Sequence, residues 1–360
     1  ETESGWDFAL NKSFTGGPAI VADADPGKLL DSVGPGADLD YYIRFDGTGI
    51  GPEWLQLDAF SLGLSNSGTF GGGGGAGAGK AVASDVSVVL GSSSTVVELT
   101  KALASGAHLK GVEIEVYQPG GIKGAGQLID EYRFDDVVMT SLNTGAGSAT
   151  VEQLSFAYGK ISYGHVDYDE KGAKAGSDAT GWDFELNKAT GGVMPAPDVD
   201  PGKLGESASL GDPMDYYVFF DGAPGWLQLE AFSLGLANSV TFGGGGASVG
   251  KVTASDVSLL LGSNLELVDL AGALASGKFL NNIEIEAYRP GGDKALVDQY
   301  YFEDLLFTGL GTGNGGGSSL SFDYARFNHG HVEYNEKGMK AGETESGWDF
   351  ALNKSFTGGP

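Results

Sequence analysis

Two pairs of carboxylates recur at the same spacing and in the same context. Asp23 and Asp25 precede Pro-Gly-Lys, and Asp198 and Asp200 precede the same three residues. Carboxylates two positions apart offer the oxygen ligands that Ca²⁺ prefers, although a full shell takes about six to eight oxygens. Pro-Gly after an extended residue is also a turn signal. The pattern leaves a calcium site and a plain acidic turn both open.

Histidines are the next candidates for metal or acid–base chemistry, and on strands they alternate with acidic residues. Side chains two positions apart share a strand face, whereas a metal site needs three or four groups that converge. Tyr163 stands where the related later segment has His329. We therefore interpret both groups as solvated strand faces; they are His165 with Asp167 and Asp169, and His329 with His331 and Glu333.

Catalytic patterns are otherwise missing from the sequence. The chain has no cysteine, which excludes thiol catalysis and disulfides, and no Gly-x-Ser-x-Gly elbow followed by a histidine and an acid. Adjacent acids such as Asp135-Asp136 are typical of polar turns. The sequence predicts a protein that is not an enzyme and has no cofactor, apart from the open calcium interpretation.

The net charge and the composition argue against some classes of partner and indicate a location for the protein. The formal net charge is −27, which argues against nucleic acid and anionic membrane surfaces as partners. No apolar run approaches the length of a membrane span. An acidic, cysteine-free chain rich in Gly, Asp and Asn is typical of bacterial surface proteins, so we expect an extracellular or cell-surface location.

A repeated stretch organises the elements around these residues. Glu1–Pro18 returns letter for letter as Glu343–Pro360, and a looser copy spans Ser177–Ala189. The chain is thus two related units and the start of a third. In each copy a Trp, a Phe and a Leu alternate with other residues, which predicts a strand with one buried face. These docking-strand residues are Trp6, Phe8, Leu10, Trp182, Phe184, Leu186, Trp348, Phe350 and Leu352.

The docking strand has little around it to cover its apolar side, because its flanks are Gly, Ser, Thr and Pro. Two interpretations are open. The strand is either the first strand of its own domain, or it adds to a free sheet edge of a neighbouring domain through main-chain hydrogen bonds.

Between the copies, the sequence predicts mostly strands. Trp54–Gly74 and Trp226–Gly246 match at 18 of 21 positions and end in glycine runs, which we expect to be long loops. One short helix per unit ends at Gly106 or Gly277, with apolar residues at helical spacing before it. Ser94 and Asn264 are the expected caps at the helix starts.

The order of these motifs resembles the haemolysin-coregulated protein (Hcp) family, the tube protein of bacterial type VI secretion. The motifs are the strand ending Phe-Asp-Gly, the Trp/Leu strand, the helix ending Ala-Ser-Gly, the strand ending Pro-Gly-Gly and the final Leu-Ser-Phe strand. The resemblance covers Asp40–Tyr168 and Asp215–Tyr334. It implies a small two-sheet β-barrel with one helix, six-membered rings that stack into tubes, and no enzymatic activity. The duplication and the extra segments depart from the family pattern.

We therefore expect a mainly β chain of two tandem Hcp-like two-sheet β-barrels, each with one short helix, joined by extended linkers that carry a docking strand. The expected divisions are 1–39 (docking strand and linker), 40–169 (first barrel), 170–214 (linker with docking strand), 215–336 (second barrel) and 337–360 (start of the next repeat).

The expected function is a structural subunit of an extracellular filament or tube, with neighbouring copies of itself as partners. The alternatives are a type VI secretion tube or carrier made of pseudo-hexameric rings, and a calcium-dependent surface adhesin.

Overall fold

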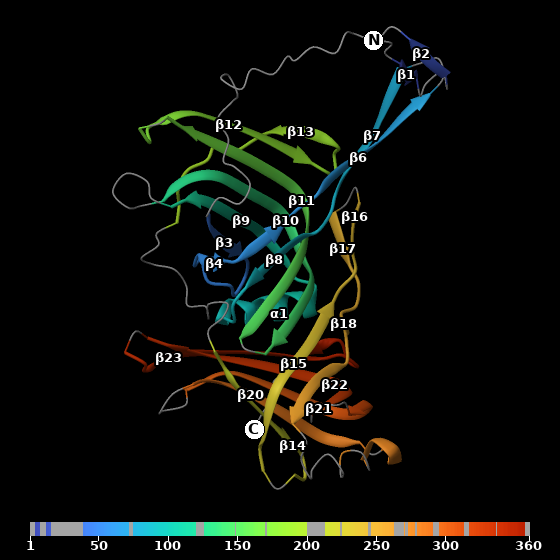
Figure 1. Cartoon of the computed structure of the whole chain (residues 1–360), viewed down its shortest axis with the longest axis vertical. Coiled ribbons are helices and arrows are strands. Elements are labelled where there is room, and N and C mark those ends of the chain that lie inside the picture. Colours follow the sequence, from blue (N-terminus) through green and yellow to red (C-terminus); the bar gives the residue numbers. More distant parts are fainter. Residues whose placement is uncertain are drawn as a thin grey trace.

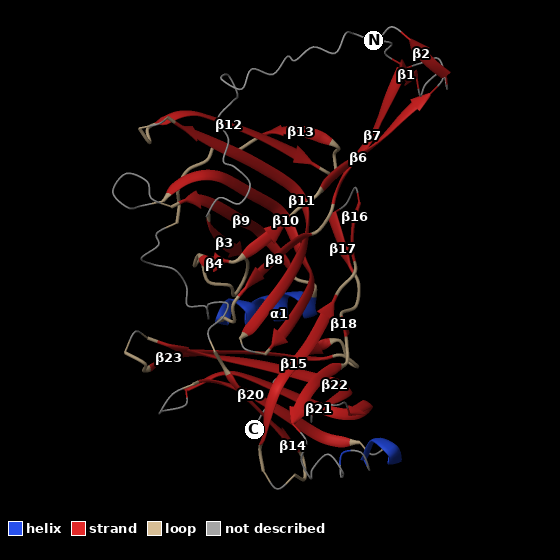
Figure 2. Ribbon diagram, viewed as in Figure 1, coloured by secondary structure: helices blue, strands red, loops and turns tan. Residues whose placement is uncertain are grey.

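The chain folds almost entirely into strands, as a computed structural model shows (Figures 1 and 2). The structure describes residues 4–7, 12–15 and 39–356, with gaps at 72–74, 120–125, 148, 170, 200–212, 224, 244–245, 263–269, 271–272, 278, 291–294, 313–316 and 336. The mainly β fold is the one that the sequence predicted. None of the helices in the described ranges is long and apolar enough to cross a membrane.

The first repeat is a ladder of antiparallel strands that closes on itself. Its pairing runs β4–β3–β9–β10–β11–β8–β5. Only Asp58 separates β4 from β5, and its N–H donates to the carbonyl of Val89 at 2.9 Å, which joins the two ends. The strands are β3 (Asp40–Asp46), β4 (Leu55–Leu57), β5 (Ala59–Ser61), β8 (Val86–Leu90), β9 (His108–Gln118), β10 (Gln127–Ala146) and β11 (Thr150–Tyr168).

The second repeat closes in the same order, β14–β15–β19–β22–β21–β20 and back to β14. Here one continuous strand, β15, takes the place of β4 and β5. The strands are β14 (Asp215–Phe220), β15 (Leu227–Ala237), β18 (Thr253–Ala254), β19 (Val257–Gly262), β20 (Leu280–Arg289), β21 (Ala295–Thr312) and β22 (Gly317–Tyr334).

Alternation in the sequence explains which faces lie inside. In β8 the side chains of Val86, Val88 and Leu90 are fully buried, while the two residues between them are partly exposed. A period of two places alternate residues on one face, and that face becomes the core of each repeat. Aromatic residues fill much of the second core; Phe302 contacts Phe322 and Tyr324 edge to face.

The first helix, α1 (Ser94–Ser105), forms where the sequence predicted one. Its cap is Ser93, one residue before the expected Ser94, and its side chain accepts a hydrogen bond from the N–H of Val96. Gly106 ends the helix with φ of 66°, a left-handed conformation that glycine adopts without strain. For the second helix, Leu270 and Ala273–Ser276 are helical, and Asn264 lies outside the described residues.

The glycine-rich segments differ from the expected loops, because their flanks pair as ribbons. β6 (Leu64–Gly71) pairs with β7 (Gly75–Ala83), and β16 (Val240–Gly243) pairs with β17 (Gly246–Val249). Strand pairing uses main-chain groups, so glycine weakens a ribbon but does not prevent it.

Three short hairpins complete the chain. They are β1 (Ser4–Asp7) with β2 (Lys12–Thr15), β12 (Lys174–Asp183) with β13 (Lys188–Gly191), and β23 (Lys340–Asp349) with β24 (Lys354–Ser355).

Candidate assembly surfaces

The three copies of the docking strand form the same hairpin in the same register. Trp6 lies opposite Ser13, Trp182 opposite Ala189 and Trp348 opposite Ser355. β12 also pairs with β11, and β23 pairs with β22, so each extends the repeat that precedes it in the sequence. Among the described residues, β1 and β2 form a sheet of two strands only. Phe8 and Leu10 lie outside the described residues.

The apolar residues of the docking strand do not all share one buried face. Phe184 and Trp348 are buried, Trp182 and Phe350 are partly buried against the core, but Leu186 and Leu352 are each 61% exposed. The strand ends at Asp183 or Asp349, whose Oδ1 accepts the N–H of the leucine three residues on, at 2.7 Å in both hairpins. This turn breaks the alternation that the sequence predicted.

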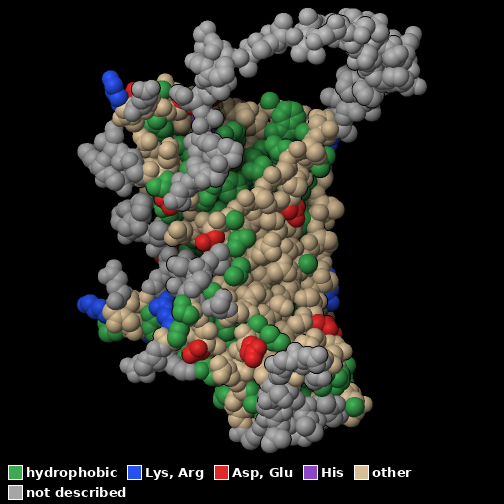
Figure 3. Space-filling view, viewed as in Figure 1, with side chains coloured by type: hydrophobic (Ala, Val, Ile, Leu, Met, Phe, Trp, Pro, Cys, Tyr) green, Lys and Arg blue, Asp and Glu red, His purple; other side chains and the backbone are tan. Residues whose placement is uncertain are grey.

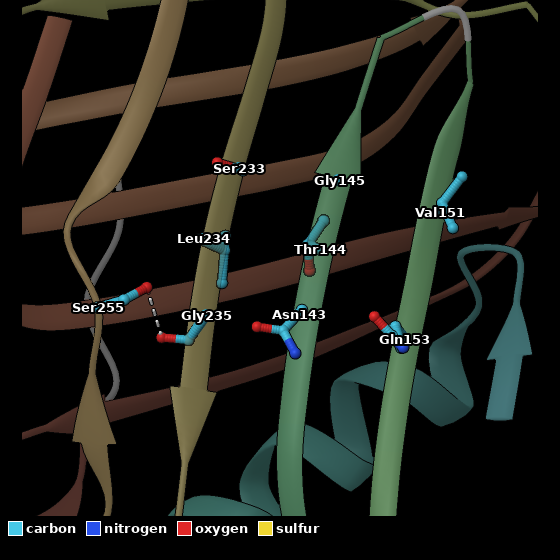
Figure 4. A pocket seen from close by; sticks show the side chains of 9 residues that line it. All are labelled: Asn143, Thr144, Gly145, Val151, Gln153, Ser233, Leu234, Gly235 and Ser255. Atoms are coloured by element: carbon cyan, nitrogen blue, oxygen red, sulfur yellow. Dashed lines mark hydrogen bonds between the residues drawn. The ribbon is translucent and has the colours of Figure 1, made fainter. Parts of the chain in front are cut away.

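The two repeats join first through main-chain pairing. Residues 141–146 of β10 form an antiparallel ladder with residues 232–237 of β15. Figure 4 shows Asn143 of β10 beside Gly235 of β15, with Ser255 donating a hydrogen bond to the Gly235 carbonyl at 3.2 Å. A Cβ at Gly235 would stand 2.7 Å from Oδ1 of Asn143, so any larger residue there would have to displace the Asn143 side chain.

The helix of the first repeat forms the other half of this junction. Figure 1 shows α1 between the two groups of strands, against β22 and β23 of the second repeat. The hydroxyl of Ser346 donates to the carbonyl of Val97 at 2.8 Å, and Nδ2 of Asn238 donates to the carbonyl of Leu103 at 3.2 Å. We call the surface of the second repeat that α1 and β10 cover the junction face.

A buried polar cluster lies within the junction. Asp298 of β21 is fully buried and accepts hydrogen bonds from Ser92 of the first repeat at 2.7 Å, from His331 at 2.7 Å and from His329 at 3.3 Å. Burial opposes ionisation of Asp298, but the hydrogen bonds from the two histidines outweigh it and lower the pKa of the carboxyl. The prediction that His329 and His331 lie on a solvated face is wrong, because both are buried and Ser92 of the first repeat bonds to His331.

The same face of the first repeat is open. Leu64 is 57% exposed, whereas its counterpart Leu236 is 1% exposed. The counterpart of Asp298 is Asp130, whose side chain is 20% exposed and bonds to Tyr163 and His165 at 2.8 and 2.7 Å. A groove of about 360 Å³ lies on this face. Its lining includes Leu64, Ala81, Ile161, Tyr163, Trp182 and Phe184. Hydrophobic side chains also gather on the first repeat in the upper half of Figure 3.

A second network holds the linker that follows β13. The N–H of Ala196 donates to Glu131 at 2.9 Å, and the N–H of Asp198 donates to Glu115 at 3.0 Å. Burial raises the pKa of Glu115 to about 7, even though these hydrogen bonds favour the charged form. Val199 packs beside Trp54 at the end of this contact.

Comparison with known proteins identifies the fold family. Residues 50–165 match the family described as "Type VI secretion system effector, Hcp". Residues 50–165 are thus a domain of the Hcp family. The match covers most of the first Hcp repeat, and the near-identity of residues 54–74 and 226–246 makes the second a copy of it. No curated protein matches the chain.

Solved structures of Hcp proteins resemble parts of the chain. One described as a type six secretion system protein is 25% identical, with 42% of this chain and all of that chain covered and a TM-score of 0.37. Hcp1 from Salmonella typhimurium is 16% identical, with 40% of this chain and 99% of that one covered (TM-score 0.30). An effector from Yersinia pestis is 20% identical over the same shares, with a TM-score of 0.30.

The Hcp repeats bring together one group of residues that the metal analysis of the sequence did not single out. The carboxylates of Glu113, Glu115 and Glu131 lie within 4.8 Å of one another. Arg44 and Arg133 pair with Glu113, and Arg133 also pairs with Glu131. These two guanidinium groups compensate Glu113 and Glu131 without a cation, and Glu115 accepts main-chain N–H groups of the linker instead. The alternating Glu-x-Glu of β9 and the facing Glu131 were the available signal.

Of the predicted calcium ligands, Asp198 alone lies within the described residues. Asp198 is exposed, and its Oδ2 lies 3.8 Å from a guanidinium nitrogen of Arg44. Asp23, Asp25 and Asp200 lie outside the described residues. Calcium binding stays a prediction.

Proposed function

We propose that this Hcp-family protein is a structural, non-enzymatic subunit of an extracellular bacterial filament or tube, in which docking strands complete each repeat and copies of the chain associate end to end. One observation carries the proposal. The first repeat covers the junction face of the second repeat, whereas the corresponding face of the first repeat is open. A second copy of the chain has the matching parts to cover it.

Those matching parts lie on the second repeat. The sequence of residues 137–145 in β10, VVMTSLNTG, corresponds to residues 305–313, LLFTGLGTG, which begin within β21. Both helices end in Ala-Leu-Ala-Ser-Gly. Each chain thus carries two sequence copies of both halves of the junction, and one copy of each forms the junction within the described part of the chain. An interface between unlike surfaces gives an open filament, or a ring where the rotation closes.

A closed ring of three chains, acting as a type VI secretion tube or carrier, is the second candidate. Membership of the Hcp family favours it. Negative-stain imaging separates the two, because the ring predicts discrete closed particles and the filament predicts continuous fibres.

The test is a charge placed on the open face. Trp182→Arg puts a cation into the groove, so we expect sedimentation velocity to show a monomer where the wild-type chain associates. The matched control is Leu186→Arg in the same hairpin. Its counterpart Leu352 stays 61% exposed when the junction has formed, so this control should assemble normally. Assembly of the Trp182→Arg chain at the wild-type concentration would refute the proposal.

The calcium-dependent adhesin alternative has its own test. Calcium titration followed by thermal melting would raise the melting temperature if the paired aspartates bind the ion, and would leave it unchanged otherwise.

A further inference from the structure

The linker contact of the first repeat has an uncovered counterpart on the second. On the first repeat, Val199 packs against a cluster of Tyr42, Trp54, Tyr117 and Leu128, beside the carboxylates that accept the linker N–H groups. The second repeat has Tyr217, Trp226, Tyr288 and Leu296 at these positions. We call this second group, together with Glu286 and Gln299, the clamp surface.

Burial separates the two surfaces clearly. Trp54 is 6% exposed, but Trp226, which begins the same Trp-Leu-Gln-Leu strand, is 43% exposed. Glu115 is fully buried, whereas Glu286 is only partly buried. Tyr288 donates to Glu286 at 2.7 Å, as Tyr117 donates to Glu115 at 2.5 Å, so the carboxylate is held the same way in both repeats.

The corresponding glycines of the two repeats, Gly164 and Gly330, show independently that the first surface is covered and the second is not. A Cβ at Gly164 would meet Pro195 of the linker at 2.4 Å, so the linker lies directly on bare backbone there. Its counterpart Gly330 is equally bare, but the nearest described atom to such a Cβ is the carbonyl oxygen of Thr344 at 4.0 Å. The second repeat keeps the shape that the linker needs while the described residues leave it uncovered.

We propose that the clamp surface binds residues 19–25 of a second copy of this chain. These residues follow Glu1–Pro18 as Met194–Asp200 follow the docking strand of the first repeat, and both segments run into Pro-Gly-Lys. In this alignment Val21, Asp23 and Ala24 replace Ala196, Asp198 and Val199, so every main-chain donor used in the first repeat is present.

A second copy is the fitting source because its strand and linker form one unit. Glu343–Asp349 already pairs with the edge of β22, and Glu1–Pro18 is identical in sequence to the segment Glu343–Pro360 that contains it. When Glu1–Pro18 of the incoming chain replaces Glu343–Pro360, the strand makes the same contacts as before. Residues 19–25 of the incoming chain then add the contact with the clamp surface. Figure 1 places β1 and β2 at the end of the molecule away from the second repeat.

The clamp surface differs from the first repeat in charge. Arg44 and Arg133, which face the acidic cluster of the first repeat, are replaced by Phe219 and Tyr301. The incoming Asp23 therefore has no guanidinium partner of the kind that Asp198 has. The contact between copies should be weaker than the one within the chain, and Phe219→Arg should strengthen it.

The experiment uses the full chain and labelled synthetic peptides. Peptide 1–28 contains the strand and the clamp segment, and peptide 1–18 contains the strand alone. We expect fluorescence anisotropy at equilibrium to show that peptide 1–28 binds about tenfold more tightly, which is about 1.4 kcal/mol. Trp226→Ala in the full chain should remove this difference, and Phe219→Arg should increase it.

Proline substitutions in the peptide give the sharpest control. Ala24→Pro removes an N–H that the carboxylate must accept, so it should abolish the gain over peptide 1–18. Ala22→Pro should keep the gain, because Pro197 holds that position on the first repeat. Equal binding of the two proline peptides, equal binding of peptides 1–18 and 1–28, or no binding of either would overturn the proposal.

The inference shares with the proposed function only the identity of the partner. Trp182→Arg should disrupt end-to-end assembly and leave binding of peptide 1–28 unchanged. Failure of one contact is therefore distinguishable from failure of the other.

Discussion

Replacement of Asp298 by alanine tests whether the junction between the repeats is a buried interface. Asp298 is fully buried, with Ser92, His329 and His331 bonded to its carboxylate. Breaking a buried charged group away from its partners costs about 3–5 kcal/mol, because the remaining polar groups stay buried without their acceptor. We expect the free energy of unfolding of Asp298→Ala to fall by that amount at pH 7.

The first repeat supplies the matched control. Asp130 occupies the same position and bonds to Tyr163 and His165, but its side chain is 20% exposed and no counterpart of Ser92 bonds to it in the described part of the chain. Loss of such a partly exposed set of hydrogen bonds costs about 1–2 kcal/mol. The assay is urea denaturation of both variants in the Trp182→Arg background, which keeps the chain monomeric.

Lowering the pH should reduce the difference in the free energy of unfolding between Asp298→Ala and Asp130→Ala. The folded state lowers the pKa of Asp298, so this group stabilises the protein above the ordinary pKa of aspartate, about 3.9, and the contribution is lost as the pH falls towards the folded-state value. Equal destabilisation by Asp298→Ala and Asp130→Ala at pH 7 would refute the reasoning, since Asp298 is fully buried with Ser92 of the first repeat bonded to it, whereas Asp130 is partly exposed.

Three further predictions follow from pairs of corresponding residues or from burial. Trp348→Ala should cost about 3–5 kcal/mol in urea denaturation, and Trp182→Ala about half as much, because Trp348 is buried and Trp182 only partly so; equal costs would contradict this. Burial raises the pKa of Glu115 to about 7, so its contribution to stability is full below about 4.5 and is lost as the pH rises through 7; Glu115→Gln should remove up to about 3 kcal/mol of pH dependence there, measured by melting across pH 4–8. Gly235→Ala should loosen the β10–β15 ladder and speed hydrogen exchange of the residue 141–146 amides, whereas Gly145→Ala should not, since no described atom lies within 4 Å of a Cβ there.

The sequence predicted the strands and the helix whose formation depends on residues close together in the chain. The motif ending Phe-Asp-Gly located β3 and β14, and the spacing of Val96, Leu99 and Leu103 before Gly106 located α1. The order of motifs also led to the Hcp family. The turn at Asp183 was less visible, because Trp-Asp-Phe reads as a strand until the aspartate bonds back to the chain.

Contacts between repeats could not be predicted in the same way. His331 is buried beside Ser92, which lies 239 positions away in the sequence. Trp54 is buried in a cluster against which Val199 of the linker packs, whereas the corresponding Trp226 is exposed. The clearest case is the 18-residue identity. In the second copy Glu343–Asp349 pairs with β22, while β1 of the first copy pairs only with β2 among the described strands. An identical sequence finds different partners because its position in the chain, not its composition, determines which edge is within reach.

The two proposed contacts between copies agree in direction, although they rest on different residues. The junction face is covered on the second repeat and open on the first, so the second repeat of one copy meets the first repeat of the next. The linker contact shows the opposite asymmetry: the surface is covered on the first repeat, and the clamp surface of the second repeat is open. The segment proposed to bind it, residues 19–25, precedes the first repeat of the incoming chain. Both contacts therefore join the second repeat of one copy to the N-terminal half of another, which repeats the arrangement within the chain. A two-fold dimer that buries the same face of both partners would be incompatible with either contact, because each joins unlike surfaces.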